Sequence, residues 1–359
     1  MNNIARIREE LLRRELDAVL VTDEKNQRYA AGFPFTDGAV LVGREKAFLI
    51  TDSRYVEAAG KAADPQVEVR MYDREHPLAV RVQEALRECG AEKVVAEDEK
   101  LSHAGYTGWE KKLGLTLLPA GKLFPMLRSV KSEEEIASMV RAQRISEQAL
   151  EEVLPLIRPG LTEREVAAEL VYRMLRHGAE GNSFDPIVVT GAKTSMPHGV
   201  PGDQVIRAGD FVTMDFGCLW DGYCSDMTRT GAVGYATDEM KRVYETVLKA
   251  QLAGIAAAKA GVPGKEIDAA ARKVIADAGY GEYFGHGFGH CLGLDIHEWP
   301  TASPKGDTPM PAGCLSSAEP GIYLPGRFGV RIEDVMIIRE DGAEVITRAP
   351  KEELLVLCA

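Results

Sequence analysis

The second half of the chain contains an ordered series of side chains that can bind metal ions. Four are carboxylates and one is an imidazole: Asp215 in VTMDFG, Asp226 in CSDMTRT, His290 in GHGFGHCLGLDIHE, Glu319 in AEPGIY and Glu333 in GVRIED. Hard oxygen donors with one borderline nitrogen suit manganese, cobalt, iron or zinc. Several buried carboxylates in one pocket would repel one another unless cations lay between them. The series therefore predicts a dinuclear metal site that performs hydrolysis.

The spacing of the carboxylates predicts how they are brought together. Asp215 and Asp226 are 11 positions apart, Glu319 and Glu333 are 14 apart, and turn residues lie between the members of each pair. Each pair is therefore expected on the two strands of a β-hairpin. A single aspartate in such a segment is more often a solvated or capping residue, so the prediction depends on the whole set.

The histidines indicate the same region. Four of the seven histidines lie in glycine-rich stretches of the second half: His198, His286, His290 and His297. A lone loop histidine is usually a surface residue, but three within 12 residues, among glycines, indicate backbone folded closely around a site. GHGFG lacks the spacing of a dinucleotide-binding turn, and no pair of these histidines forms H-E-x-x-H. We therefore reject a Rossmann-type site, and the histidine spacing argues against a helix-borne single-zinc protease.

The elements that must position these residues fall into two segments. Residues 1 to about 125 alternate helix-like and strand-like pieces, with a hairpin expected at Gly43, and predict a small α/β domain. Ser132 followed by Glu135 predicts a capping box that opens a long helix, so the boundary lies at about 125–131. We place the domains at 1–127 and 128–359.

An internal similarity predicts that the second domain is duplicated. Residues 159–178 resemble residues 260–279 at an offset of 101, which superposes Gly160 on Gly261. Two unrelated amphipathic helices with similar ends would also explain this match. In both halves, however, a glycine-rich segment with histidine follows, and then a carboxylate-bearing hairpin. A pseudo-twofold internal repeat with the metals near its axis is the simplest construction.

Composition excludes several classes of protein. The chain has 359 residues, of which 45% are hydrophobic, and no apolar run approaches the length of a membrane span, so one to three domains with an ample core are expected. The first residues show no signal-peptide pattern, which favours a cytoplasmic location. The net charge of −12 argues against a nucleic-acid partner.

At these residues the chain resembles the "pita-bread" metallopeptidases, the family of proline peptidases, aminopeptidase P and methionine aminopeptidase. All five ligand positions match in type and order. TDSRY at 51–55 and LRSVKSEEEI at 127–136 resemble a creatinase-type amino-terminal domain, and SMPHGV, DGYCSDMTRT, HEWP and EPGIYLPGRFGVRIED resemble the bacterial Xaa-Pro aminopeptidase branch. The resemblance covers nearly the whole chain. It implies an α/β (α+β) fold in which a small α/β domain precedes a pita-bread catalytic domain.

The resemblance also implies a ligand set and a mechanism. Two divalent ions per subunit are expected, manganese first, with cobalt, zinc or iron as alternatives. Asp226 and Glu333 would bridge the two ions, Asp215 would complete one, and His290 with Glu319 would complete the other. A hydroxide bridging the metals would attack the peptide bond, with Glu319 as the proton shuttle.

Further residues match family positions around the substrate. His198 and His297 are implied to steady the oxyanion and the substrate carbonyl, and His286 to lie near the substrate pocket. Tyr323 and Arg331 match positions that hold the Asp215 carboxylate. A surface location would be the ordinary interpretation of Arg331, but on an alternating strand it shares a face with Glu333.

These residues favour an aminopeptidase that releases the first residue from Xaa-Pro peptides, with a dipeptidase restricted to Xaa-Pro as the alternative. A strict dipeptidase needs an Arg or Lys for the substrate carboxylate. The candidates, Arg327 and Lys193, are not persuasive. The expected partners are small peptides and a second copy of the chain, because the N-terminal domain has no visible chemistry of its own and in the family covers an active site.

Three other classes of protein fit the sequence less well, and a few positions depart from the family pattern. A creatinase-like metal-free C–N hydrolase and a catalytically silent binding module both lack the carboxylate set, and short methionine aminopeptidases lack the N-terminal domain. Ser316 and Ser317 replace an apolar run, which predicts looser packing behind Glu319. Cys291 stands where glycine is common, and Lys193 replaces a small polar residue. None of these departures removes a predicted metal ligand, so they bear on the range of substrates and not on metal binding.

Overall fold

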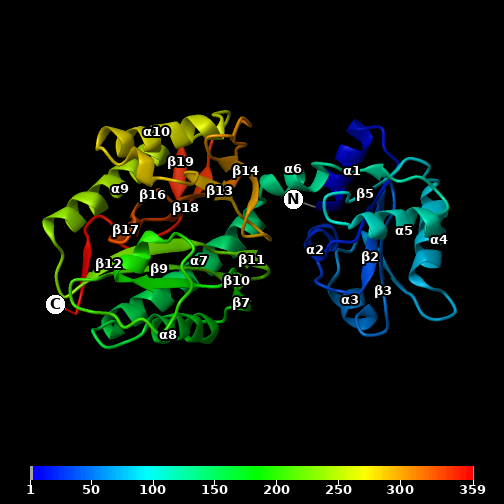
Figure 1. Cartoon of the computed structure of the whole chain (residues 1–359). Helices are drawn as coiled ribbons and strands as arrows, with labels where there is room; N and C mark the ends of the chain where they lie inside the picture. The colour runs from blue at the N-terminus through cyan, green and yellow to red at the C-terminus, as the bar shows by residue number, and fades with distance from the viewer. Residues whose placement is uncertain (1–2, 359) are drawn as a thin grey trace. The chain divides into compact units, whose positions relative to one another are not determined.

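The computed structural model describes residues 3–358. The chain divides into two compact units, Met1–Arg128 and Ser129–Ala359 (Figure 1). Ser132 and Glu135 form the predicted capping box at the start of the long helix α7. No helix within residues 3–358 is long and apolar enough to cross a bilayer.

The N-terminal unit is built on one six-stranded sheet with the order β4-β3-β2-β1-β5-β6. Strands β2 and β3 form the predicted hairpin, in which the Gly43 amide donates to the Lys46 carbonyl at 2.8 Å. All four residues of β1 are apolar and buried, so this strand is covered on both faces, and Ala18 and Leu20 share a core cluster with Val82 and Ala85 of helix α4. The elements are α1 (Asn3–Arg13), β1 (Ala18–Val21), α2 (Glu24–Ala31), β2 (Gly38–Gly43), β3 (Ala47–Thr51), α3 (Val56–Ala62), β4 (Val67–Met71), α4 (Leu78–Cys89), β5 (Val94–Ala96), α5 (His103–Leu113), β6 (Leu118–Pro119) and α6 (Leu123–Ser129).

The second unit has two main sheets, of orders β20-β12-β9-β8 and β14-β13-β15-β18-β19. We call it the catalytic unit after the expectation that follows from the family resemblance. Its first half contains α7 (Glu133–Val153), α8 (Glu163–Arg176), β7 (Gly181–Asn182), β8 (Ile187–Thr190), β9 (Phe211–Phe216), β10 (Cys218–Trp220), β11 (Tyr223–Cys224) and β12 (Met227–Val233). Its second half contains α9 (Asp238–Ala257), α10 (Gly264–Asp277), β13 (Gly289–Cys291), β14 (Glu298–Ala302), β15 (Leu315–Ala318), β16 (Gly321–Leu324), β17 (Phe328–Arg331), β18 (Asp334–Ile338), β19 (Ala343–Val345) and β20 (Leu355–Leu357). Short 3-10 helices are η1 (Leu154–Leu156), η2 (Gly191–Ser195) and η3 (Gly281–Tyr283).

The two halves of the catalytic unit repeat the same local plan. Helices α8 and α10 start and end at positions that differ by the predicted offset of 101 residues, and Gly160 and Gly261 before them both have positive φ, 101° and 83°. Only glycine adopts such angles without strain, which explains its recurrence before each helix. The strand order β8-β9-β12 in one sheet corresponds to β13-β15-β18 in the other. Figure 1 shows α9 and α10 on one side of these strands and α8 on the other.

The carboxylate-bearing strands pair as expected, but neither pair is a simple hairpin. In the first half β9 and β12 are antiparallel, with Asp215 opposite Thr228, yet the short strands β10 and β11 intervene. They pair with each other, and β10 also pairs with β7. In the second half the ribbon β16–β17 intervenes between β15 and β18. The strands pinch together at Gly217, where an added Cβ would lie 2.0 Å from the Ser225 carbonyl oxygen. The residues beyond this close approach continue as a short ribbon that ends in the predicted turn, where Trp220 pairs with Tyr223. In the second half, β16 and β17 likewise pair around the predicted turn. Both predicted hairpins are therefore present, each interrupted between its carboxylate-bearing strands and its turn.

Candidate metal centre

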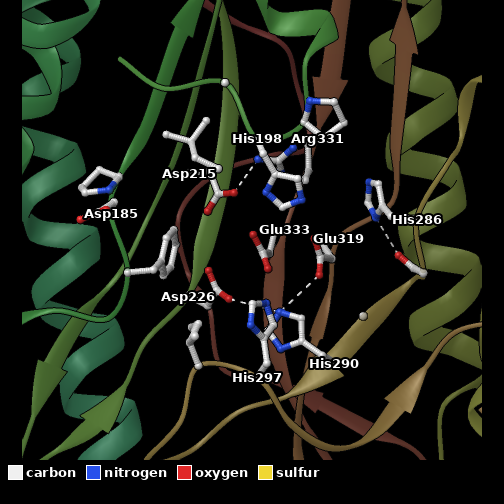
Figure 2. Close-up of a pocket in the computed structure, with 18 of the residues that line it drawn as sticks. Asp185, His198, Asp215, Asp226, His286, His290, His297, Glu319, Arg331 and Glu333 are labelled. Carbon is white, nitrogen blue, oxygen red and sulfur yellow. Dashed lines mark hydrogen bonds and ion pairs between the residues drawn. The ribbon is translucent and has the colours of Figure 1, made fainter. Parts of the chain in front are cut away.

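All five predicted ligands line one pocket of about 590 Å³ in the catalytic unit, together with His198, His286, His297 and Arg331. Figure 2 shows the carboxylates pointing toward one another from strands of both halves. The two main sheets meet here, because the Glu333 amide donates to the Thr228 carbonyl at 3.1 Å and joins β12 to the segment before β18. The sheet junction thus brings residues far apart in sequence to one point.

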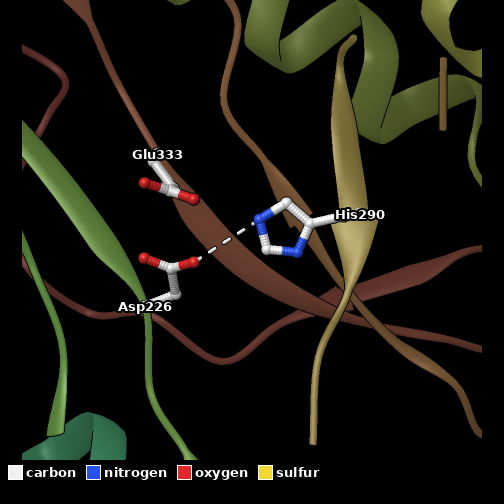
Figure 3. A group of neighbouring side chains, drawn as sticks. All are labelled: Asp226, His290 and Glu333. Carbon is white, nitrogen blue, oxygen red and sulfur yellow. Dashed lines mark ion pairs between the residues drawn. The ribbon is translucent and has the colours of Figure 1, made fainter. Parts of the chain in front are cut away.

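The tightest group in this pocket consists of Asp226, His290 and Glu333 (Figure 3). One possible ligand atom from each lies within 4.8 Å of the others. Asp226 immediately precedes β12 and Glu333 precedes β18, so strand pairing fixes both. Two carboxylates and an imidazole in this geometry can hold a divalent transition metal.

The His290 ring is oriented so that one nitrogen faces the carboxylates. Its Nδ1 lies 3.0 Å from the Cys291 carbonyl oxygen and so acts as the donor, which leaves the lone pair on Nε2. Nε2 lies 3.6 Å from Asp226 Oδ2 and 3.4 Å from Glu319 Oε1. Burial lowers the pKa of His290 and favours the neutral ring. A neutral imidazole with a free Nε2 is the form that binds a metal.

Asp215 is held by a chain of buried hydrogen bonds. Arg331 donates through Nη2 to Asp215 Oδ2 at 2.5 Å and through Nη1 to the Tyr323 hydroxyl at 2.9 Å. That hydroxyl lies 2.8 Å from His286 Nε2, while His286 Nδ1 lies 2.9 Å from the Gly287 carbonyl oxygen. Burial lowers the pKa of His286 to about 4, so Nδ1 carries the proton and Tyr323 donates to Nε2. This series of hydrogen bonds fixes only one of the two carboxylate oxygens of Asp215.

The protonation of the carboxylates reflects their burial and mutual repulsion. Burial raises the pKa of Asp226 well above its usual range, and the charges of Asp215 and Glu319 raise it further. Burial and then the charge of Asp226 raise the pKa of Glu333 in the same way. Burial raises the pKa of Glu319 to about 7. Without cations the pocket would have to bind protons at neutral pH.

These properties fit a metal centre. Asp215 Oδ1 is buried and has no hydrogen-bond partner, although its sister oxygen is bound by Arg331. A buried carboxylate oxygen without a donor is costly unless a cation satisfies it. A cation would also stabilise the buried, mutually repelling carboxylates and would bind the lone pair on Nε2 of His290. The donor types, their burial and the unsatisfied oxygen therefore all fit a bound metal ion.

His198 and His297 also line the pocket, and both are exposed. His198 follows η2 in a loop between β8 and β9, and His297 immediately precedes β14. The His297 ring packs edge-on against His290 with centroids 4.3 Å apart. Partial desolvation of the His297 ring within the pocket lowers its pKa. Both rings are accessible to a substrate in the pocket, which suits the roles expected from the family resemblance.

The sequence did not lead us to predict the hydrogen bonds that two hydroxyl residues make at the site. Thr228 donates to Glu333 Oε2 at 2.7 Å and accepts from Arg331 Nε at 3.1 Å. Its position two residues after Asp226 on a strand was the signal that could have identified it. Ser317 donates to Glu319 Oε1 at 3.2 Å and accepts from the His290 amide at 3.0 Å.

The expectation that Ser316 and Ser317 loosen the packing behind Glu319 is wrong. Both side chains are fully buried. Ser317 replaces apolar contact with hydrogen bonds that tie β15 to β13. The strands approach so closely that a Cβ added at Gly289 would lie 2.1 Å from the Ser317 carbonyl oxygen. Glycine before the ligand histidine is therefore required by strand spacing.

Neither candidate clamp for a substrate carboxylate reaches the pocket. Lys193 Nζ donates to Glu163 at 2.6 Å and to the Val200 carbonyl at 2.7 Å, and Arg327 is paired with Glu239. Among the described residues that line the pocket, Arg331 is the one Arg or Lys, and it is engaged by Asp215.

Comparison with protein families matches both units. Residues 137–340 match the model of metallopeptidase family M24, and residues 3–130 match the creatinase/prolidase N-terminal domain. Both matches agree with the fold class and the family resemblance inferred from sequence. The family is metal-dependent, which agrees with the donor group in the pocket.

Relatives and solved structures match nearly the whole chain. A structure described as a Xaa-Pro dipeptidase from Bacillus anthracis is 42% identical, covers 99% of each chain and superposes with a TM-score of 0.94. A structure described as an X-Pro aminopeptidase from Thermotoga maritima is 36% identical, covers 97% of this chain and 99% of its own, and has a TM-score of 0.91. A Xaa-Pro dipeptidase of Pyrococcus horikoshii is 35% identical over 97% of both chains.

Proposed function

The chain belongs to metallopeptidase family M24, and we propose that it is a dipeptidase that hydrolyses the Xaa-Pro bond. The enzyme is a metallopeptidase. The dipeptidases among its relatives, 42% and 35% identical over almost the whole chain, support this substrate over the longer peptides favoured by the sequence analysis. The observation that underlies the chemistry is the group formed by Asp226, His290 and Glu333 beside Glu319.

We propose that the five ligands hold two divalent ions, with manganese first and cobalt, zinc or iron as alternatives. Asp226 and Glu333 would be shared, Asp215 would complete one site, and His290 with Glu319 the other. Such ions, when bound, acidify water and make a nucleophile available at neutral pH. Metal analysis of the purified, reconstituted protein measures how many ions bind to each chain. A single ion per chain, in wild type and in Glu333→Ala alike, would contradict two sites.

The residues of the chain have distinct tasks in the proposed reaction. Glu319 lies beside the ligand His290 and, as a carboxylate, can accept a proton from water and return it to the departing proline nitrogen. His198 and His297 are placed to donate hydrogen bonds to the substrate carbonyl oxygen as it becomes negatively charged. Arg331 and Tyr323 keep Asp215 in one orientation, and neutral His286 accepts from Tyr323 without adding charge.

The substrate is tested by comparing a dipeptide with a longer peptide. We expect kcat/KM for Ala-Pro to exceed that for Ala-Pro-Pro-Ala, and no hydrolysis of Ala-Ala-Pro. The Glu319→Gln protein, assayed in parallel, controls for contaminating peptidases. Preferential cleavage of the tetrapeptide would contradict the dipeptidase assignment.

An Xaa-Pro aminopeptidase is the second candidate. The observation that favours it is that the described pocket residues include no Arg or Lys besides Arg331, so the catalytic unit offers no spare cation to a dipeptide carboxylate. The solved X-Pro aminopeptidase is also 36% identical. The same pair of substrates separates the two activities.

We also propose that the chain forms a homodimer. All the residues that line the pocket belong to the catalytic unit, which leaves the N-terminal unit without a chemical task of its own. Sedimentation at micromolar concentration tests this proposal. A stable monomer would contradict it.

A further inference from the structure

The pocket is bordered by residues 191–202, which we call the His198 loop. It begins with η2, contains SMPHGVPG and precedes β9. Its two large apolar residues beyond η2, Met196 and Val200, are 58% and 76% exposed. Apolar burial therefore contributes little to holding this loop. Its position must depend on polar contacts.

One buried carboxylate binds two residues of the loop and the residue just before it. Glu163, the first residue of α8, is fully buried. Its Oε1 accepts from the Thr190 amide at 2.9 Å, and its Oε2 accepts from the Gly202 amide at 2.9 Å and from Lys193 Nζ at 2.6 Å. A single side chain thus holds the residue before the loop, its third residue and its last residue.

Lys193 closes the loop from within. Besides binding Glu163, its Nζ donates to the Val200 carbonyl at 2.7 Å. Val200 is two residues beyond His198, so this contact spans the segment that contains the histidine. The first turn of α8 adds a backbone contact, since the Arg164 amide donates to the Gly202 carbonyl at 3.1 Å. The lysine and the carboxylate join both arms of the loop to one rigid helix end.

We infer that Lys193 and Glu163 are positioning residues that fix His198 for its contact with the substrate. The inference rests on the proposed function, because it assigns His198 to the reacting carbonyl. Lys193 is one of the positions at which the sequence departs from the family pattern. The structure gives that lysine a role in the loop instead of the role of a carboxylate clamp. A misplacement of about 1 Å at a catalytic group can lower a rate by about 100-fold.

The variant Lys193→Met tests the inference, because methionine keeps the length of the side chain and removes both contacts. The matched control is Lys273→Met, which removes an exposed lysine paired with Asp277 at 2.6 Å on α10 of the same unit. Hydrogen–deuterium exchange of peptides within 190–204 is the first readout. Exchange should quicken in Lys193→Met and stay at the wild-type rate in the control. Glu163→Ala should quicken it as well.

Kinetics on Ala-Pro is the second readout. We expect kcat to fall by about tenfold or more in Lys193→Met with a smaller change in KM, and metal content to stay unchanged. In the double variant with His198→Ala the lysine change should cost nothing further, because it acts through that histidine.

Two results would overturn the inference: unchanged exchange in residues 190–204, or a loss from Lys193→Met that is undiminished in the His198→Ala background. Exchange needs no substrate. If the wild-type protein fails to cleave Ala-Pro while exchange quickens as expected, the proposed function is wrong and the anchoring role of Lys193 stands.

Discussion

Replacing Asp226 by asparagine should stabilise the metal-free protein and destabilise the metal-loaded protein. The change removes one negative charge from the carboxylate group and hardly alters its shape. Asp226 is 4% exposed, and chelator would leave it beside Glu333 with no metal ion between the two carboxylates. With metal present, the same carboxylate is a proposed ligand. The sign of the effect therefore depends on the metal.

The magnitude follows from the geometry. Ligand atoms of Asp226 and Glu333 lie within 4.8 Å of each other. Two unit charges at that distance repel by about 3 kcal/mol at an effective dielectric constant of about 20. Protonation relieves part of this repulsion, because burial first, and then neighbouring charges, raise the pKa of both groups. We expect a gain of about 2 kcal/mol, which in a unit of this size raises Tm by about 4–8 °C.

In excess manganese the wild type should be more stable than Asp226→Asn, the reverse of the order expected in chelator. At a free concentration 100 times Kd, each bound ion stabilises the folded protein by about 2.7 kcal/mol. Asp226→Asn loses a ligand that both ions are proposed to share, so it should gain much less than the wild type. Differential scanning calorimetry in EDTA and in excess manganese measures both differences.

The matched control is Asp268→Asn. Asp268 is also buried, at 1% exposure, but it accepts from the Phe288 amide at 2.9 Å and from Arg272 Nε at 2.8 Å. Loss of the Asp268 carboxylate should destabilise the protein both in EDTA and in excess manganese. If Asp226→Asn also lowers Tm in EDTA, the carboxylates do not repel one another and the reasoning fails.

The remaining predictions concern the residues around this group. Glu319→Gln should lower kcat by about 100-fold or more, because an amide cannot accept the proton; initial rates on Ala-Pro measure this. In chelator, the free energy of unfolding should fall by about 3 kcal/mol as pH rises from about 4.5 to about 7. Over that range the folded protein keeps the proton on Glu319, whose pKa burial raises from 4.5 to about 7, and the unfolded chain releases it. Urea denaturation at several pH values checks the slope, and a flat profile would contradict it. In chelator, Arg331→Met should lower the free energy of unfolding by about 3–5 kcal/mol, because Asp215 is left buried without its partner. Urea denaturation measures this loss as well. Gly289→Ala should weaken manganese binding in calorimetric titration, because its Cβ would lie 2.1 Å from the Ser317 carbonyl oxygen and force β13 away from β15.

The sequence by itself determined the kinds of donor atoms, their order and the family. Local patterns were sufficient for much of the fold as well. The capping box at Ser132, the hairpin at Gly43 and the repeat at an offset of 101 residues all appear as predicted. The capping box and the hairpin depend on side chains within a few positions of one another, and the repeat is found by comparing two such local patterns, so all three can be recognised without tertiary information.

Only the tertiary structure decided which residues far apart in the sequence form hydrogen bonds with one another. Ser317 was expected to loosen the site, yet it joins Glu319 to the His290 amide. Lys193 was weighed as a substrate clamp, yet it binds Glu163, 30 positions away. Hydrogen bonds of this kind form only where packing brings separate strands and helix ends together. The sequence specifies that packing through the whole core, so no single motif reveals it.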